Sequence, residues 1–146
     1  MHRFFSVRQG LAGCAALLLA VSCREPMSVE RFVGGAEPYV FTVDMGDTTA
    51  VYDFDLYTRI DDRPEVVRDL KELHLQISWT SPSDTTFRED VYMPMNGRVS
   101  FFSRQARAPY RAGVRPSEAG EWTISIRTPE APQGLQGMGL CVRKKR

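Results

Sequence analysis

The 146-residue chain has too little of several features to fit some common functional classes. Its formal net charge is only +1, so it lacks the basic excess that an obligate nucleic-acid-binding protein needs. Beyond residue 22 the chain has one histidine and two cysteines, a poor supply for a zinc site, which takes three or four such ligands. The longest small and apolar run, residues 11–21, is well short of the roughly 20 residues of a membrane-spanning helix. We therefore expect no nucleic-acid partner, no metal, no cofactor and no transmembrane helix.

The N-terminal segment is typical of an export signal. Arg3 and Arg8 precede the apolar run, and the first 22 residues contain no acidic residue. The run ends in Leu-Ala-Val-Ser-Cys (residues 19–23), which resembles the lipobox of bacterial lipoproteins. We therefore predict that residues 1–22 are a lipoprotein signal peptide and that Cys23 becomes the acylated first residue of the mature chain.

Other interpretations of the N-terminus stay open. Leu-Ala-Gly-Cys (residues 11–14) matches a lipobox better by its letters, but cleavage before Cys14 would leave residues 15–21 as an apolar leader on the mature protein. Ordinary secretion and a retained anchor are further alternatives. If Cys23 carries lipid, Cys141 has no intramolecular disulfide partner, and we predict that it is a small core residue.

The mature chain has the alternation of β-strands. Residues 23–37 contain Pro26, Gly34 and Gly35, and we predict a lipidated cysteine followed by a short tether. Beyond it, apolar and polar residues alternate with period 2 in several segments. The clear strand candidates are residues 39–43, 52–60, 73–79, 122–126 and 138–142, and the weaker ones are 86–93, 98–103 and 110–115. A half-buried sheet needs a second sheet to cover it, so residues 38–146 are predicted to form an all-β, two-sheet β-sandwich or jelly roll.

Local features predict how the strands are joined. Asn96 and Gly97 suit a type I′ hairpin turn, in which both central residues have positive φ. Residues 64–73 could form one short helical turn. Residues 134–139 are rich in glycine but open a strand rather than a helix, so they predict a bulge or a close backbone crossing instead of a phosphate loop.

Carboxylates form the main candidate catalytic group. Asp53 and Asp55 share one strand face, and Asp61 and Asp62 follow shortly after. Two carboxylates at positions i and i+2 of a strand lie roughly 7 Å apart, which suits an inverting glycoside hydrolase, and acidic pairs also bind calcium. Alternating acids also keep the outer face of a sheet wet, and this is the interpretation that we favour.

Three further features have both a functional and a structural interpretation. His74 is the one histidine of the mature chain, and no nucleophile motif accompanies it, so we expect an exposed strand histidine. The basic residues 143–146 could hold anionic lipid headgroups, but we expect a solvated end. Exposed aromatic residues could form a sugar-binding platform, although core burial is expected for Trp79 and Trp122. The candidates for such a platform are Tyr57, Trp79, Phe101, Phe102, Tyr110 and Trp122.

Several stretches resemble the gliding-motility lipoprotein GldH family of Bacteroidota. They are YDFDLYTR (residues 52–59), ELHLQI (72–77), GEWTISI (120–126) and GLQGMGLCV (134–142). The resemblance runs in order over roughly residues 39–143. The family's Trp-Leu-Gly segment after the central hairpin is replaced here by Arg-Val-Ser-Phe (residues 98–101).

The resemblance implies a non-enzymatic envelope lipoprotein linked to the motility and secretion machinery. On this basis we expect a protein held in the outer membrane by acyl chains on Cys23, facing the periplasm and binding an envelope protein partner. The main alternative is an envelope binding module for carbohydrate or another ligand. A carboxylate-based hydrolase that uses Asp53 and Asp55 is a further alternative, and the oligomeric state stays open.

Overall fold

The computed structural model describes residues 28–145, so the predicted signal peptide, Cys14, Cys23 and residue 146 lie outside the described residues. One short helix, α1 (Pro64–Asp69), accompanies eight strands. The strands are β1 (Ser28–Gly34), β2 (Tyr39–Met45), β3 (Val51–Asp61), β4 (Glu72–Thr80), β5 (Thr86–Pro94), β6 (Ser103–Val114), β7 (Gly120–Arg127) and β8 (Leu135–Lys145). Helix α1 lies within residues 64–73, where the sequence allowed one helical turn.

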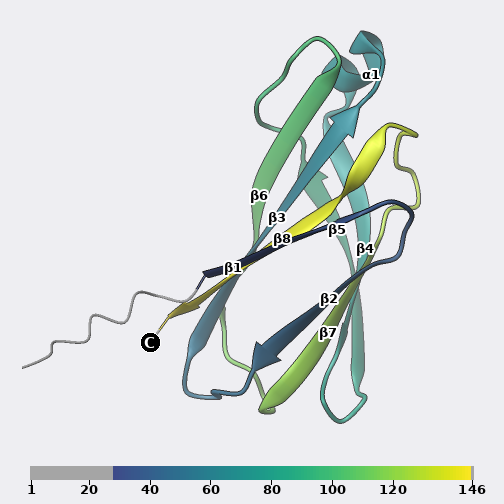
Figure 1. Cartoon of the computed structure of the whole chain (residues 1–146). Coiled ribbons are helices and arrows are strands. Elements are labelled where there is room, and N and C mark those ends of the chain that lie inside the picture. The colour runs from purple at the N-terminus through teal and green to yellow at the C-terminus, as the bar shows by residue number, and fades with distance from the viewer. Residues whose placement is uncertain (1–27, 146) are drawn as a thin grey trace, which may run out of the picture.

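The eight strands form two antiparallel four-stranded sheets, which confirms the predicted two-sheet sandwich (Figure 1). The β3 sheet has the order β1-β8-β3-β6, and the β4 sheet has the order β2-β7-β4-β5. Among consecutive strands, only β4 and β5 lie in the same sheet, and every other connection crosses from one sheet to the other. This is the strand order of a jelly roll.

The core lies between the sheets and follows the alternation of the sequence. In β2 every second residue is buried, from Tyr39 to Met45, and β4 has the same pattern from Leu73 to Trp79. Phe54 of β3 meets Trp79 of β4 edge to face, with ring centroids 5.0 Å apart, and so joins the two sheets. Burial of a large apolar side chain contributes about 1.5–3 kcal/mol to the free energy of folding. Because each sheet buries the apolar side chains of the other, the two sheets stabilise each other.

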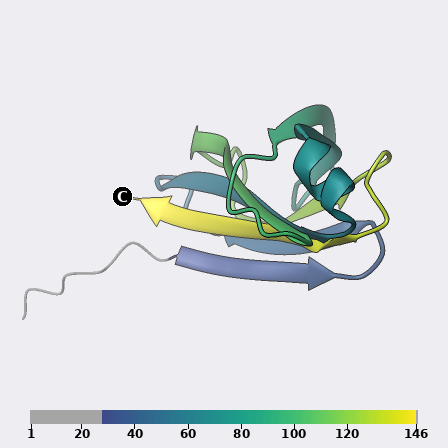
Figure 2. The same ribbon diagram turned by 90° about the horizontal axis from the view of Figure 1, so that it is seen from above.

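The predicted tether is wrong for part of its length. Ser28–Gly34 form β1, an edge strand whose seven residues pair with β8 from Ser28 opposite Arg143 to Gly34 opposite Gly137. Figure 2 shows β1 alongside β8 at the edge of the sandwich. The sequence concealed this strand because an edge strand that covers little core has no regular apolar alternation; Val29 and Phe32 are both 44% exposed. The sandwich therefore includes residues 28–34, which lie before the predicted boundary at residue 38.

The predicted hairpin at Asn96 and Gly97 is also wrong. Neither residue has positive φ, and the connection there joins β5 of the β4 sheet to β6 of the β3 sheet. A type I′ turn suits neighbouring antiparallel strands, so it has no place in a crossover between sheets. The weak strand candidate at residues 98–103 is reduced to a single bridge between Val99 and Arg104.

The two ends of the sandwich differ in what they carry. At one end lie the start of β1, the end of β8 and the loops that join β2 to β3, β4 to β5 and β6 to β7. At the other end lie α1 and the loop between β5 and β6. Figure 2 shows the C-terminal end of β8 and helix α1 at opposite ends of the molecule.

Deletion of Ser28–Gly34 from the full chain tests the role of β1. We expect the free energy of unfolding to fall by about 2 kcal/mol or more, because β8 loses the neighbouring strand that covers its apolar residues at the edge of the sheet. This corresponds to a drop in Tm of about 8 °C or more for a domain of this size, measured by circular dichroism. An unchanged Tm would mean that the segment is only a tether.

Candidate functional site: ion pairs across the outer face of the β3 sheet

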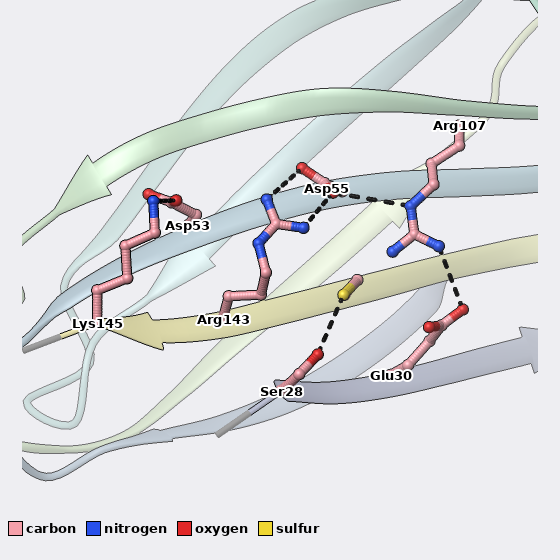
Figure 3. Close-up of polar contacts among 8 residues, drawn as sticks. Ser28, Glu30, Asp53, Asp55, Arg107, Arg143 and Lys145 are labelled. Atoms are coloured by element: carbon pink, nitrogen blue, oxygen red, sulfur yellow. Dashed lines mark hydrogen bonds and ion pairs between the residues drawn. The ribbon is translucent and has the colours of Figure 1, made fainter. Parts of the chain in front are cut away.

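The outer face of the β3 sheet, turned away from the β4 sheet, carries the candidate carboxylates. Asp53 and Asp55 alternate with the buried Tyr52, Phe54 and Leu56, so they point outward as predicted. They are nevertheless only 6% and 9% exposed. The expectation of wet outer-face acids is therefore wrong, because long cationic side chains from the neighbouring strands lie over them (Figure 3).

Asp55 is the centre of a network of charges that reaches all four strands. Its two oxygens accept hydrogen bonds from Arg143 of β8 at 2.6 and 3.1 Å. Arg107 of β6 places its Nε 3.7 Å from Asp55 Oδ2 and its Nη1 3.5 Å from Glu30 of β1 (Figure 3). A bidentate arginine pair of this kind fixes orientation as well as charge. The network therefore ties the edge strands β1 and β6 to the centre of the sheet.

Asp53 has a separate set of partners. It forms an ion pair with Lys145 of β8 and accepts a hydrogen bond from the backbone N–H of Gly113 at 2.9 Å. The Lys145 ammonium and, after it, the Gly113 N–H lower the pKa of the Asp53 carboxyl. A carboxyl that is ionised at neutral pH cannot donate a proton to a leaving group. This geometry gives Asp53 a structural role.

The predicted solvated C-terminal tail is wrong for residues 143–145. These residues extend β8, and each has an acidic partner: Arg143 pairs with Asp55, and Lys145 pairs with Asp53. Lys144 points to the opposite side of the strand, where its Nζ lies 3.5 Å from Asp47. Three basic residues that the sequence offered for anionic lipids are thus neutralised within the domain.

Cys141 is buried, as predicted, but it is not a core residue. It is 2% exposed and lies on the outer face, opposite Glu30 and Asp55 in the strand register. Its Sγ lies 3.7 Å from the hydroxyl of Ser28. The alternation of β8 gives the inward positions to Met138, Leu140 and Val142, so Cys141 fills a place beneath the ion pairs.

The remaining polar candidates are held apart from one another. Asp61 pairs with Arg59 at 2.8 Å, while Asp62 accepts a hydrogen bond from the N–H of Gly134 at 3.1 Å. His74 lies 2.8 Å from Asp90 and stacks on Tyr92. Within residues 28–145, no three His, Cys, Asp or Glu side chains come together in a way that could hold a metal ion. In that same part of the chain, no helix is long and apolar enough to cross a membrane.

The two tryptophans belong to the core, as predicted. Trp79 and Trp122 are 8% and 6% exposed, and their rings meet edge to face at 73°. Rings buried at this angle cannot form the flat exposed platform that the carbohydrate alternative predicted from them. Phe101 and Phe102, by contrast, are 71% and 60% exposed at the end of the sandwich that carries α1.

A hydrogen-bonded cluster of four side chains, called the clasp below, joins β4 and β5 of one sheet to β6 of the other; its members are Trp79, Glu89, Tyr110 and Arg111. The indole N–H of Trp79 donates to the Tyr110 hydroxyl at 2.8 Å, and that hydroxyl donates to Glu89. Arg111 also donates to Glu89, at 2.6 and 3.2 Å. Burial and the Glu89 carboxylate together raise the pKa of Tyr110 to about 12. Tyr110, a candidate for a sugar platform, therefore joins the two sheets.

The surface has several hollows that the sequence did not predict. One groove of about 650 Å³ lies between β1 and β2, with Phe41 and Leu140 among its lining residues. A second hollow, of about 710 Å³, lies on the outer face of the β3 sheet around Tyr57 and Arg107, next to the ion pairs. The residues that line the second hollow come from β1, β3, β6 and the loop between β5 and β6, so no single sequence motif indicated it.

No protein-family model matches the chain, and no curated protein matches it.

The acid stability of Asp53→Asn tests the pairing with Lys145. Because the folded state lowers the pKa of Asp53, its contribution is present above the unfolded value near 3.9 and is lost as pH falls through the folded pKa. We expect the wild type to have the higher Tm at pH 7 and the difference to shrink below about pH 4. Asp44→Asn, which changes an exposed strand carboxylate, is the control. A difference that stays constant or grows with acid would contradict the pairing.

Tyr110→Phe tests the clasp. The substitution leaves the indole N–H of Trp79 without its acceptor and Glu89 without one donor, so we expect a loss of about 1–3 kcal/mol in urea unfolding. Tyr92→Phe, at a residue that is 58% exposed, should change the free energy of unfolding by less than about 0.5 kcal/mol. Equal losses of unfolding free energy for the two substitutions would show that the clasp does not stabilise the fold.

Proposed function

We propose that this protein is a lipid-anchored component of the bacterial envelope, with Cys23 as the acylated residue and a jelly-roll domain that takes part in a non-enzymatic assembly. The observation that carries the proposal is the short distance in sequence between Cys23 and β1. Ser28 opens β1 only five residues after Cys23. Five extended residues span at most about 18 Å, so an anchor at Cys23 would hold the sandwich close to a bilayer.

The strand register supports a defined orientation. Ser28 is opposite Arg143, so the anchored end of the domain is the end where β8 finishes and where the loop between β4 and β5 lies. Helix α1 and the exposed Phe101 and Phe102 lie at the other end. An anchor at Cys23 would therefore direct these aromatic side chains away from the membrane, toward a partner in the periplasm.

The state of the polar residues supports a non-enzymatic role. The carboxylates that a hydrolase would use are in ion pairs, and the Asp53 carboxyl has a lowered pKa. His74 is held by Asp90 and Tyr92. The resemblance of four strand segments to the GldH family adds the proposed setting, an outer-membrane assembly linked to motility and secretion.

Palmitate labelling in a bacterial host with lipoprotein processing tests the anchor. We expect radiolabelled palmitate on the wild type and on Cys14→Ala, and none on Cys23→Ser, because only Cys23 would receive the acyl chains. The Cys23→Ser protein should also leave the membrane fraction. Label that persists on Cys23→Ser and disappears from Cys14→Ala would contradict the assignment.

Crosslinking in intact cells tests the assembly. A photoreactive amino acid at position 102 should give a discrete adduct, whereas the same probe at position 84, at the anchored end, should give none. The adduct at position 102 should decrease when Phe101 is replaced by Ser. Crosslinks of equal yield at both positions, or none at either, would contradict an assembly contacted through the far end.

A further inference from the structure

The hollow on the outer face of the β3 sheet has an unusual construction. Four residues lie in one row across the sheet: Phe32 of β1, Gly139 of β8, Tyr57 of β3 and Arg107 of β6. In the next row toward α1, β1 contributes Gly34 and β8 contributes Gly137. Gly139 and Gly137 leave room for the rings of Tyr57 and Phe32, which lie against them, and the hollow of about 710 Å³ lies beside these two rings.

Two aromatic rings form the apolar part of the hollow. The Tyr57 ring lies over Gly139, where a Cβ would come 2.1 Å from the ring carbon Cζ. The Phe32 ring lies beside it, with centroids 5.9 Å apart and planes inclined by only 30°. Both rings line the hollow, and Phe32 is 44% exposed. The Arg107 guanidinium lies over the Tyr57 ring, 5.5 Å from its centroid, so the exposed Phe32 ring beside Tyr57 offers most of the apolar surface that a ring-shaped ligand could use.

Polar side chains surround these rings on the side of β6. Asn96, Arg98 and Gln105 line the hollow, and the close packing of Gly97 on the backbone of Gln105 holds the loop against β6. The side chains of these three polar residues have no hydrogen-bond or ion-pair partner in the part of the chain that the structure describes. Two amides supply both donors and acceptors, and the guanidinium supplies donors in a fork that matches a carboxylate.

The charge of the hollow favours an acidic ligand. Arg59, Arg98 and Arg107 line it against the single acid Glu30. Arg59 is paired with Asp61, and Arg107 is shared between Glu30 and Asp55. Of the three arginines that line the hollow, Arg98 is therefore the one without an acidic partner among the described residues, and its guanidinium can meet a ligand. Its charge lies at the rim, where it can meet one anionic group without displacing an internal pair.

We propose that this hollow binds an acidic sugar of the uronic acid class. The apolar face of a pyranose ring lies on Phe32 beside Tyr57, its hydroxyls exchange hydrogen bonds with Asn96 and Gln105, and its carboxylate pairs with Arg98. The proposal does not depend on the anchor at Cys23. Of the aromatic candidates that the sequence offered for a sugar platform, Tyr57 alone lines this hollow, and Phe32 was not among those candidates.

Titration calorimetry with the full-length protein in detergent tests the proposal, with tri-galacturonate as the probe and neutral galactotriose as its matched partner. We expect tri-galacturonate to bind at least about tenfold more tightly than galactotriose. Arg98→Gln should remove most of this preference, whereas Tyr57→Leu should weaken the binding of both sugars. Arg88→Gln, which removes an exposed arginine of the β4 sheet, should leave both affinities unchanged.

Two measurements keep a loss of folding separate from a loss of binding. Each variant is first compared with the wild type by circular dichroism, and Gln105→Ala at the exposed rim provides a second variant that leaves Tyr57 and Phe32 intact. We expect Gln105→Ala to weaken tri-galacturonate binding about three- to tenfold. Binding that is absent in the wild type, equal for the two sugars, or reduced as much by Arg88→Gln as by Arg98→Gln would overturn the proposal.

Discussion

The pairing of β8 with β1 on one side and β3 on the other is the interaction on which the rest of the structure depends. β8 is the last strand of the chain, and it holds the first strand in the sheet. Its inward residues Met138, Leu140 and Val142 enter the core, while Arg143 and Lys145 neutralise the acids of β3. Its glycines let the rings of Tyr57 and Phe32 lie close against the sheet. The core, the ion pairs and the packing of these two rings are thus three consequences of one strand and its register.

The ion pairs of the outer face have a cost that their geometry must offset. Burying a carboxylate is unfavourable unless it is paired and hydrogen-bonded. Asp55 meets this requirement with two arginines, and Asp53 with a lysine and a backbone N–H. Removal of one partner would leave a poorly solvated charge, so these residues act together. This explains how alternating acids, which usually mark a wet face, can be buried on the outside of a sheet.

The parts of the fold that could be predicted are those governed by local alternation. β2, β4 and β7 bury every second residue, and their positions followed from the sequence alone. The edge strand β1 could not be found in this way, because its neighbour β8 is more than 100 residues away and its own side chains are largely exposed. The failure of the hairpin at Asn96 and Gly97 has a similar cause, since a turn motif carries no information about which sheet the next strand will join.

The candidate site shows the same division. The outward direction of Asp53 and Asp55 followed from the period of β3, but their burial depends on cations brought from β6 and β8 by the long-range register. The hollow over Tyr57 depends on three strands and a crossover loop, and no local motif encodes that combination. The glycines of residues 134–139 predicted a close backbone approach, which the backbone contacts of Gly134 with Asp61 and of Gly137 with Val33 confirm, but they did not predict the hollow.

The central claim is a jelly roll held to a bilayer by the end at which β1 begins. Its most direct test is the depth of nitroxide spin labels at positions 84 and 102 of the full-length protein in vesicles that contain a headgroup-bound relaxation agent. The account predicts strong relaxation at position 84, in the loop between β4 and β5, and weak relaxation at position 102. Stronger relaxation at position 102, or equal relaxation at both, would contradict it.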